Sequence, residues 1–153
     1  MPVAAVLLVL LGCSGCWTGG SKSKAKQISV FDVKPGDCFG APGQVKAELT
    51  KLSSVACSAP HTQEAYAKVG YRSKDGSTPS TYPGDALLKS FADGACAQEF
   101  TGYVGTDYLD SSLFFTYLLP SARGWEQQQD RNVVCFVTTT GKTLTSSVKG
   151  TKQ

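Results

Sequence analysis

The spacing of apolar residues changes several times after residue 27, and these changes predict the secondary structure. Alternation of apolar and polar residues, as in 28–33, 64–71 and 132–138, is typical of strands with one buried face. A mixed pattern over 45–56 and a continuous apolar and aromatic run over 112–119 also predict strands. Most of the chain is therefore expected to form a sheet.

The segment 83–104 has a different period, with apolar residues three and four positions apart, which predicts one amphipathic helix. Pro83 in the first turn and Asp85 near the N-terminus suit a helix start. The residues that share the predicted apolar face are Leu88, Phe91, Ala92, Ala95, Cys96, Phe100 and Tyr103. Cys96 is therefore expected to point into the core.

The predicted elements occur in the order β-β-β-α-β-β-β, and the last is an edge strand over 143–148. Turn residues at 58–61 separate the strands 45–56 and 64–71, so we expect these two strands to form a hairpin. The order predicts an α+β domain with a mostly antiparallel sheet, one main helix packed across a face and two disulfides. A chain of 153 residues suits one such domain, which we place at 28–150.

The N-terminus has the features of an export signal. Residues 3–11 form an apolar run that is too short to span a bilayer and is followed by Gly-Cys, the pattern of a bacterial lipobox. We predict a lipoprotein signal peptide at 1–13 with lipidation at Cys13. Cys16 is the alternative lipid site, and a plain secretory signal or a short anchor is the alternative interpretation.

Residues 14–27 are rich in Gly, Ser and Lys and have little to bury, which predicts a flexible tether. Acyl chains on the preceding cysteine would hold the protein to the membrane. We therefore expect the domain at the outer face of the cell membrane.

Four cysteines remain after the two near the signal are set aside: Cys38, Cys57, Cys96 and Cys135. An even number in an exported chain predicts disulfides, and four cysteines allow three pairings. We favour Cys38 with Cys57, which are close in sequence, and Cys96 with Cys135, which both point toward the core. Zinc is the competing interpretation, but no two of these cysteines have the close spacing of a structural zinc site.

The stretch 57–66 contains the only histidine of the chain, His61, three residues before Glu64. If the Cys38–Cys57 bridge brings Asp37 close, the three side chains could form a metal site or an acid–base pair. The alternative is a structural role in which His61 hydrogen-bonds backbone groups and Glu64 pairs with a lysine. A single histidine favours the structural interpretation, because zinc needs at least three protein ligands. We therefore predict no metal, no cofactor and no catalytic residues.

Trp125 is followed by Asp130 and Arg131. An exposed Trp and Arg are residue types that anchor interfaces, so these three residues, together with His61 and Glu64, are the candidate interaction surface. The alternative for the Asp-Arg pair is a structural salt link.

Composition excludes several classes of function. With 41% hydrophobic and 18% charged residues the chain is an ordinary globular protein, and its net charge of +3 comes mostly from scattered lysines, which argues against nucleic acid as a partner. Nucleophile elbows, phosphate-binding loops and dinucleotide fingerprints do not occur.

Several separated motifs resemble the septum formation family. They are DVKPGDCF at 32–39, VACSAPH at 55–61 with Glu64, YPG at 82–84 before the helix with Cys96, the segment 120–125, DRNVVC at 130–135 and LTSSV at 144–148. The resemblance covers about residues 31–150. Two positions depart from the usual pattern, because Gln129 and Ser146 stand where glycines are common.

This resemblance implies an exported or membrane-anchored protein with a role in septum formation, and it implies no catalytic residues. We therefore predict a non-catalytic, lipid-anchored, extracytoplasmic module that binds a protein or cell-wall partner. The alternative is a metal-dependent or acid–base hydrolase that uses His61, Glu64 and Asp37.

Overall fold

The structure is a computed structural model that describes residues 25–41 and 49–153. The predicted signal peptide at 1–13, both candidate lipidation cysteines and residues 14–24 of the predicted tether lie outside the described residues. So do residues 45–48 of the strand expected over 45–56.

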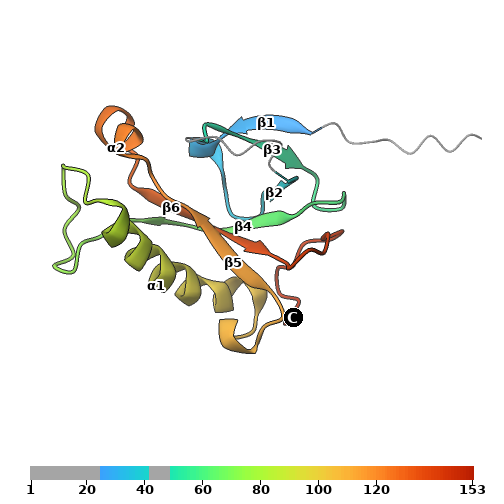
Figure 1. Cartoon of the computed structure of the whole chain (residues 1–153). Coiled ribbons are helices and arrows are strands. Elements are labelled where there is room, and N and C mark those ends of the chain that lie inside the picture. The colour runs from blue at the N-terminus through green and yellow to red at the C-terminus, as the bar shows by residue number, and fades with distance from the viewer. Residues whose placement is uncertain (1–24, 42–48) are drawn as a thin grey trace, which may run out of the picture.

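Within the described residues, six strands form one antiparallel sheet in the order β1-β3-β2-β4-β6-β5 (Figure 1). The strands are β1 (Lys26–Ser29), β2 (Cys38–Phe39), β3 (Lys51–Val55), β4 (Gln63–Gly70), β5 (Phe114–Leu118) and β6 (Asn132–Thr138). The helices are α1 (Asp85–Val104) and α2 (Ala122–Gln128), with short 3-10 turns η1 (Val30–Asp32) and η2 (Tyr108–Asp110). The predicted α+β fold class is confirmed.

Helix α1 packs across one face of the sheet, as its apolar period predicts. It follows Gly84, whose φ of 93° favours glycine, and it ends at Gly105 in the left-handed region. The predicted inward residues Leu88, Ala92, Cys96, Phe100 and Tyr103 are buried, while Phe91 and Ala95 are half-buried. The main core lies between this face of α1 and strands β4 and β6.

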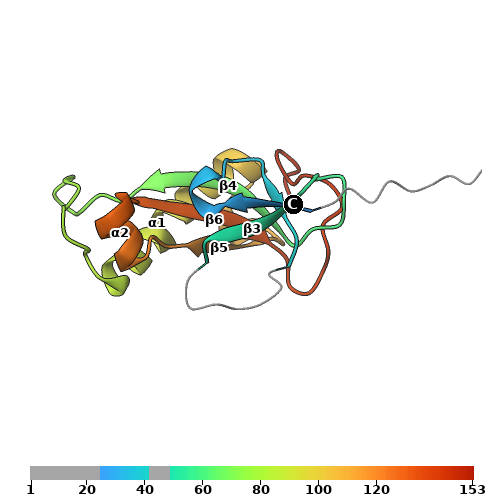
Figure 2. The same cartoon turned by 90° about the horizontal axis from the view of Figure 1, so that it is seen from above.

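A second core covers the opposite face of the sheet. Along β6, Val133, Cys135 and Val137 face the core under α1, while Val134 and Phe136 belong to the second core. Figure 1 shows β1, β3 and η1 on the far side of the sheet from α1, and Figure 2 shows β1 and β3 lying over β6 and β5. The sheet therefore curls over itself, and β6 is buried on both faces.

The predicted hairpin of 45–56 with 64–71 is wrong, because β2 lies between β3 and β4. Cys38 of β2 pairs with Val55 on one side and with Glu64 on the other. The turn at 58–61 therefore connects β3 to β4 across the end of β2. The expected edge strand over 143–148 is also wrong, since only Leu144 makes a bridge, with two 2.9 Å backbone hydrogen bonds to His61.

Two further details differ from the sequence prediction. Strand β1 begins at Lys26, so the sheet includes the last two residues that we assigned to the tether. The short helix α2 was not predicted. Its N-cap is Ser121, whose hydroxyl accepts a hydrogen bond from the N–H of Gly124 at 2.9 Å.

Both predicted disulfides are present. Cys38 and Cys57 are bonded with their Cα atoms 5.2 Å apart, and Cys96 and Cys135 with theirs 5.6 Å apart. The first links β2 to the turn after β3, and the second links α1 to β6 through the main core. The faces deduced for Cys96 and Cys135 were therefore correct.

Candidate functional site

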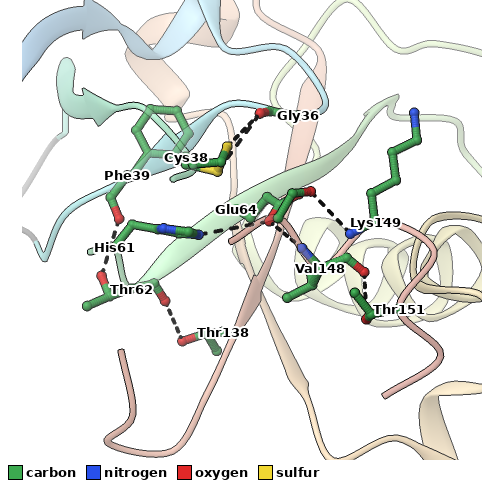
Figure 3. A network of polar contacts seen from close by, with 12 residues as sticks. Gly36, Cys38, Phe39, His61, Thr62, Glu64, Thr138, Val148, Lys149 and Thr151 are labelled. Atoms are coloured by element: carbon green, nitrogen blue, oxygen red, sulfur yellow. Dashed lines mark hydrogen bonds and ion pairs between the residues drawn. A yellow bond between two sulfur atoms is a disulfide. The ribbon is translucent and has the colours of Figure 1, made fainter. Parts of the chain in front are cut away.

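Glu64 lies at the centre of a buried polar cluster that joins the sheet, α1 and the C-terminal segment. We call Glu64, His61, Tyr103, Ser147 and Val148 the Glu64 cluster. Figure 3 labels Glu64, His61 and Val148. Glu64 is 0% exposed, and its carboxylate accepts hydrogen bonds from the Tyr103 hydroxyl at 2.5 Å and the Ser147 hydroxyl at 2.6 Å, both at Oε1. The N–H of Val148 donates to Oε2 at 2.9 Å. A buried carboxylate with three donors is well compensated.

His61 lies on the other side of Oε2. Its Nδ1 is 2.8 Å from the carbonyl oxygen of Ala59, and a carbonyl only accepts, so Nδ1 carries the proton and donates. Its Nε2 is 3.9 Å from Oε2 of Glu64, is buried and has no hydrogen-bond partner among the described residues. Figure 3 shows the ring directed at the Glu64 carboxylate.

Tyr103 remains a donor in this cluster. Burial, and secondly its hydrogen bond to the Glu64 carboxylate, raise the pKa of its hydroxyl well above the ordinary value. Both effects disfavour the phenolate, so the hydroxyl keeps its proton and continues to donate to Glu64. The cluster therefore holds α1 and the 147–148 segment against β4.

This arrangement corrects the prediction that His61 and Glu64 belong to an interaction surface. His61 is 1% exposed and Glu64 is 0% exposed, so neither can touch a partner. Asp37 does not complete a triad with them, because no ligand atoms of Asp37, His61 and Glu64 all lie within 4.8 Å of one another, and the Asp37 carboxylate instead accepts a hydrogen bond from the N–H of Lys34 at 2.8 Å. A substrate could not reach the pair without opening the fold, which argues against the hydrolase.

The Cys38–Cys57 disulfide adjoins Glu64. The two sulfur atoms and a carboxylate oxygen of Glu64 all lie within 4.8 Å of one another. Figure 3 places Cys38 beside the Glu64 carboxylate. Sulfur atoms bonded to each other do not bind metal ions, so in the oxidised protein this group is structural.

Trp125 is also buried rather than exposed, which corrects its place in the predicted interaction surface. It is 0% exposed, and its indole N–H donates to the carbonyl oxygen of Ser80 at 3.0 Å. The rings of Tyr71 and Tyr82 pack edge-on against it, with centroids 5.8 Å and 5.9 Å away. Trp125 therefore anchors α2 to the end of β4 and to the loop before α1.

Arg131 and Asp130 support this anchor. The guanidinium carbon of Arg131 lies 4.0 Å from the centroid of Trp125, and one guanidinium nitrogen donates to the carbonyl oxygen of Trp125 at 2.5 Å. The carboxylate of Asp130 accepts a hydrogen bond from the N–H of Asn132 at 3.1 Å. Both residues are half-buried, and these local contacts occupy them. The structural role that we gave as the alternative for Asp130 and Arg131 is therefore favoured. The contacts that support it are the stacking of Arg131 on Trp125 and hydrogen bonds to backbone groups, not a salt link between the two residues.

The surface does contain a groove, which sequence patterns did not reveal. It lies between α2 and the curled part of the sheet formed by η1 and the start of β3, and has a volume of about 840 Å³. Its floor is made by Lys68, Val134 and Leu118, which are adjacent across β4, β6 and β5. We call this feature the α2 groove.

The α2 groove is lined by more basic than acidic side chains. Lys51, Lys68 and Arg123 line it, whereas Asp130 is the one acidic residue in the lining among the residues that the structure describes. The ammonium group of Lys68 donates to the carbonyl oxygen of Phe31 at 2.6 Å, which holds it beside η1. Lys51 and Arg123 are exposed. Positive charge beside the apolar side chains of Val134 and Leu118 suits a partner with acidic and apolar groups.

No sequence motif marks this groove, because its basic residues come from three distant segments. The one local signal is Lys68, a charged residue within a largely buried strand. A lysine at such a position indicates a polar opening in that face of the sheet. The other two basic residues are ordinary surface positions in the sequence.

None of the helices in the described ranges, 25–41 and 49–153, has both the length and the apolar character needed to cross a bilayer. Comparison with curated proteins found no significant match, and comparison with solved structures also found none. Comparison with protein families matched residues 35–153 to the family described as septum formation. That match includes both disulfides, Glu64 with its donors, and the Trp125 anchor. Since it spans most of the chain, this protein belongs to the septum formation family.

Proposed function

We propose that the protein is a non-catalytic, lipid-anchored module on the outer face of the cell membrane, where its α2 groove binds an acidic partner during septum formation. Membership of the septum formation family indicates a role in cell division. The observation that carries the binding role is the α2 groove, in which Lys51, Lys68 and Arg123 line the same hollow as the apolar Val134 and Leu118.

Two features support the location outside the cytoplasm. The described residues contain two disulfides, which persist in oxidising compartments and are rare in the cytoplasm. The sequence ahead of the domain has the Leu-Leu-Gly-Cys pattern ending at Cys13, which suits lipid attachment. A lipid anchor would keep the groove close to the membrane where the septum forms.

The non-catalytic role is supported by the state of the titratable groups. His61 and Glu64, the pair best suited to acid–base chemistry, are buried and engaged in the Glu64 cluster. Among the described residues, the groove lining combines basic, amide and hydroxyl side chains with the carboxylate of Asp130, which accepts a hydrogen bond from the N–H of Asn132. Such a surface can bind and orient a partner.

The groove is tested by reversing its charge. In the double variant Lys51→Glu/Arg123→Glu both changed residues are exposed, so the fold should persist. We expect the tagged variant to lose its septal position in dividing cells and to lose the division partner that crosslinks to the unchanged protein. Binding to purified cell wall, measured by co-sedimentation, shows whether that partner is the wall itself.

The matched control is Lys74→Glu/Lys142→Glu, which makes the same charge change at exposed residues outside the groove lining. This control should keep its septal position and its crosslinks. A uniform distribution of the unchanged protein over the envelope, with no division partner, would contradict the proposal. If both double variants lost their septal position and crosslinks equally, the net charge of the protein, and not the groove, would determine where it binds.

The lipid anchor is tested by mass analysis of the mature N-terminus. We expect a chain that begins with diacylated Cys13, or with Cys16 if the alternative site is used. A Cys13→Ala/Cys16→Ala variant should then be released from the membrane fraction. Unmodified thiols at both positions would refute lipid anchoring while leaving the groove proposal intact.

A further inference from the structure

We propose that Cys38, Cys57, His61 and Glu64 form a closed site for a thiophilic divalent cation such as Zn²⁺ when the Cys38–Cys57 disulfide is reduced. This site is separate from the α2 groove, since none of the four residues lines the groove. Its success or failure is therefore independent of the proposed binding role.

The first observation is the state of His61. Its Nδ1 donates to the carbonyl oxygen of Ala59 at 2.8 Å, so in the neutral imidazole the lone pair is on Nε2. Metal-bound histidines usually donate their other ring N–H to a carbonyl or carboxylate, because that bond fixes the tautomer and the ring direction. His61 thus has the orientation of a ligand, and its Nε2 has no hydrogen-bond partner among the described residues.

The second observation is what Nε2 faces. Oε2 of Glu64 lies 3.9 Å away and accepts one hydrogen bond, from Val148, so it keeps a second lone pair. Two buried lone pairs that face each other repel unless a proton or a cation lies between them. For Zn–N and Zn–O bonds of about 2.0–2.2 Å, a nitrogen and an oxygen around a tetrahedral zinc ion lie roughly 3.3–3.5 Å apart, so the observed pair would close by about 0.5 Å on binding.

The third observation is the disulfide beside this pair. Both sulfur atoms lie within 4.8 Å of each other and of a Glu64 carboxylate oxygen. Two thiolates, one imidazole and one carboxylate are donor types that zinc accepts in fourfold coordination. In the oxidised protein His61 is not part of this group of three, so the sulfur atoms must separate before all four donors can surround one ion.

The fold permits that separation at one end of the bridge. Cys38 is buried in β2, which is paired on both sides by β3 and β4. Cys57 is half-buried and lies in the turn after β3, outside any strand. Reduction would therefore free the Cys57 segment to move while Cys38, His61 and Glu64 keep their places.

The reduction step needs an external dithiol. One thiolate of the dithiol attacks Sγ of Cys57, the disulfide bond breaks, and Cys38 leaves as a thiolate. The second thiolate of the dithiol then displaces Cys57, so the dithiol is oxidised to a cyclic disulfide and two electrons pass to the protein. Zn²⁺ binds both cysteines as thiolates, and any protons they carried go to solvent.

Accessibility makes this reduction selective. Cys96 and Cys135 are both 0% exposed within the main core, so a dithiol cannot reach their bond without unfolding the protein. We expect mild dithiol treatment to open Cys38–Cys57 first. Alkylation followed by mass analysis identifies which cysteines have become free.

The test uses the reduced protein after the dithiol is removed without oxygen. Co²⁺ alone is titrated first, because tetrahedral thiolate coordination gives intense absorption, and Zn²⁺ is then used to displace it. We expect one ion per reduced chain and at least roughly 100-fold weaker binding to the oxidised chain, which lacks the two thiolate ligands.

His61→Gln and Glu64→Gln in the reduced protein should each weaken binding by about 10-fold or more, since each removes a ligand. Glu99→Gln, an exposed position on α1, is the matched control and should bind as the unchanged protein does. Equal affinity in all of these variants would mean that the metal binds the thiols without the buried pair, and it would overturn the proposal.

Folding is followed by circular dichroism, because the reduced chain or a variant could unfold. If the reduced chain is folded and binds no metal, the proposal fails. If it unfolds and Zn²⁺ restores the fold, the site is supported, since binding of a structural metal contributes folding free energy. Unfolding that Zn²⁺ does not reverse, or reduction of Cys96–Cys135 before Cys38–Cys57, would also overturn it.

Discussion

The carboxylate of Glu64 accepts a hydrogen bond from the backbone N–H of Val148, 84 residues later in the chain, at 2.9 Å. The neighbouring Ser147 hydroxyl binds the same carboxylate. In a regular sheet, a neighbouring strand would accept a hydrogen bond from such a backbone N–H. Here the side chain of Glu64 accepts it instead. Glu64 therefore explains why 143–148 is held in place although it is not a strand.

Glu64→Ala should lower the free energy of unfolding by about 3 kcal/mol, because it leaves two buried donors, the Tyr103 hydroxyl and the N–H of Val148, without an acceptor and also removes the bond from the Ser147 hydroxyl. Tyr103→Phe, which removes one donor and leaves the carboxylate with two, should cost about 1.5 kcal/mol. Denaturant unfolding of both variants gives the comparison. If Glu64→Ala cost no more than Tyr103→Phe, Glu64 would not be the centre of the cluster.

Stability should fall at alkaline pH. Burial raises the pKa of Tyr66 and Tyr103 above the ordinary value of 10.0, and the carboxylates of Glu99 and Glu64 respectively add to this effect. A raised pKa in the folded state means that the folded protein binds the proton more tightly, so this stabilisation is complete below pH 10 and is lost as the pH rises above it.

The measurement is thermal unfolding across alkaline pH, with phenolate absorbance recorded in parallel. Tyr66 and Tyr103 should ionise only as the protein unfolds. Tyr103→Phe should be less stable at neutral pH and should lose stability less steeply above pH 10, because one of the two groups is absent. Ionisation of every tyrosine in the folded protein near the ordinary value would contradict this prediction.

Gln129→Gly should stabilise the protein by about 1 kcal/mol, because Gln129 ends α2 in the left-handed region with a φ of 53°. Only glycine adopts that conformation without strain. The matched control, Gln128→Gly, lies within α2 and should instead destabilise by about 1 kcal/mol. Thermal unfolding decides, and a loss of stability in Gln129→Gly would show that its side chain makes a needed contact.

Arg131→Ala should destabilise the protein by about 2 kcal/mol, since it removes the stacking on Trp125 and the hydrogen bonds to the carbonyl oxygens of Trp125 and Ser80. Arg131→Lys should recover only part of this, because an ammonium group cannot stack and bridge at once. Arg123→Ala, an exposed position on α2, is the control and should change stability by less than about 0.5 kcal/mol. Urea unfolding tests all three.

The backbone conformation at Gln129 explains one of the two positions at which this chain departs from the usual family pattern. The family usually has glycine where this chain has Gln129, and Gln129 adopts a positive φ. Ser146, the other departure, is not among the described residues with positive φ. The glycine preference at position 129 therefore reflects the backbone conformation that ends α2, whereas that conformation does not explain the preference at position 146.

Sequence patterns predicted the features that depend on one element at a time. The helix over 83–104 and the inward faces of Cys96 and Cys135 follow from local periods, and the pairing of these two cysteines follows from those faces. Strand order did not follow, because β2 is only two residues long and gives no period, yet it separates β3 from β4. Helix α2 was missed for a similar reason, since seven residues give barely two turns.

The sequence alone determined the α+β class, the main helix and the family, and it favoured the two disulfide pairings that the structure contains, because periodicity, cysteine count and motif order are properties of the chain itself. Only the tertiary structure decided that His61, Glu64 and Trp125 are buried, and that Lys51, Lys68 and Arg123 line one groove. The period of a strand shows which residues share a face. Whether that face is buried depends on segments that are distant in the sequence, and the period carries no information about them. Here the curl of β1 and β3 over the sheet formed the groove, and the 147–148 segment closed over Glu64.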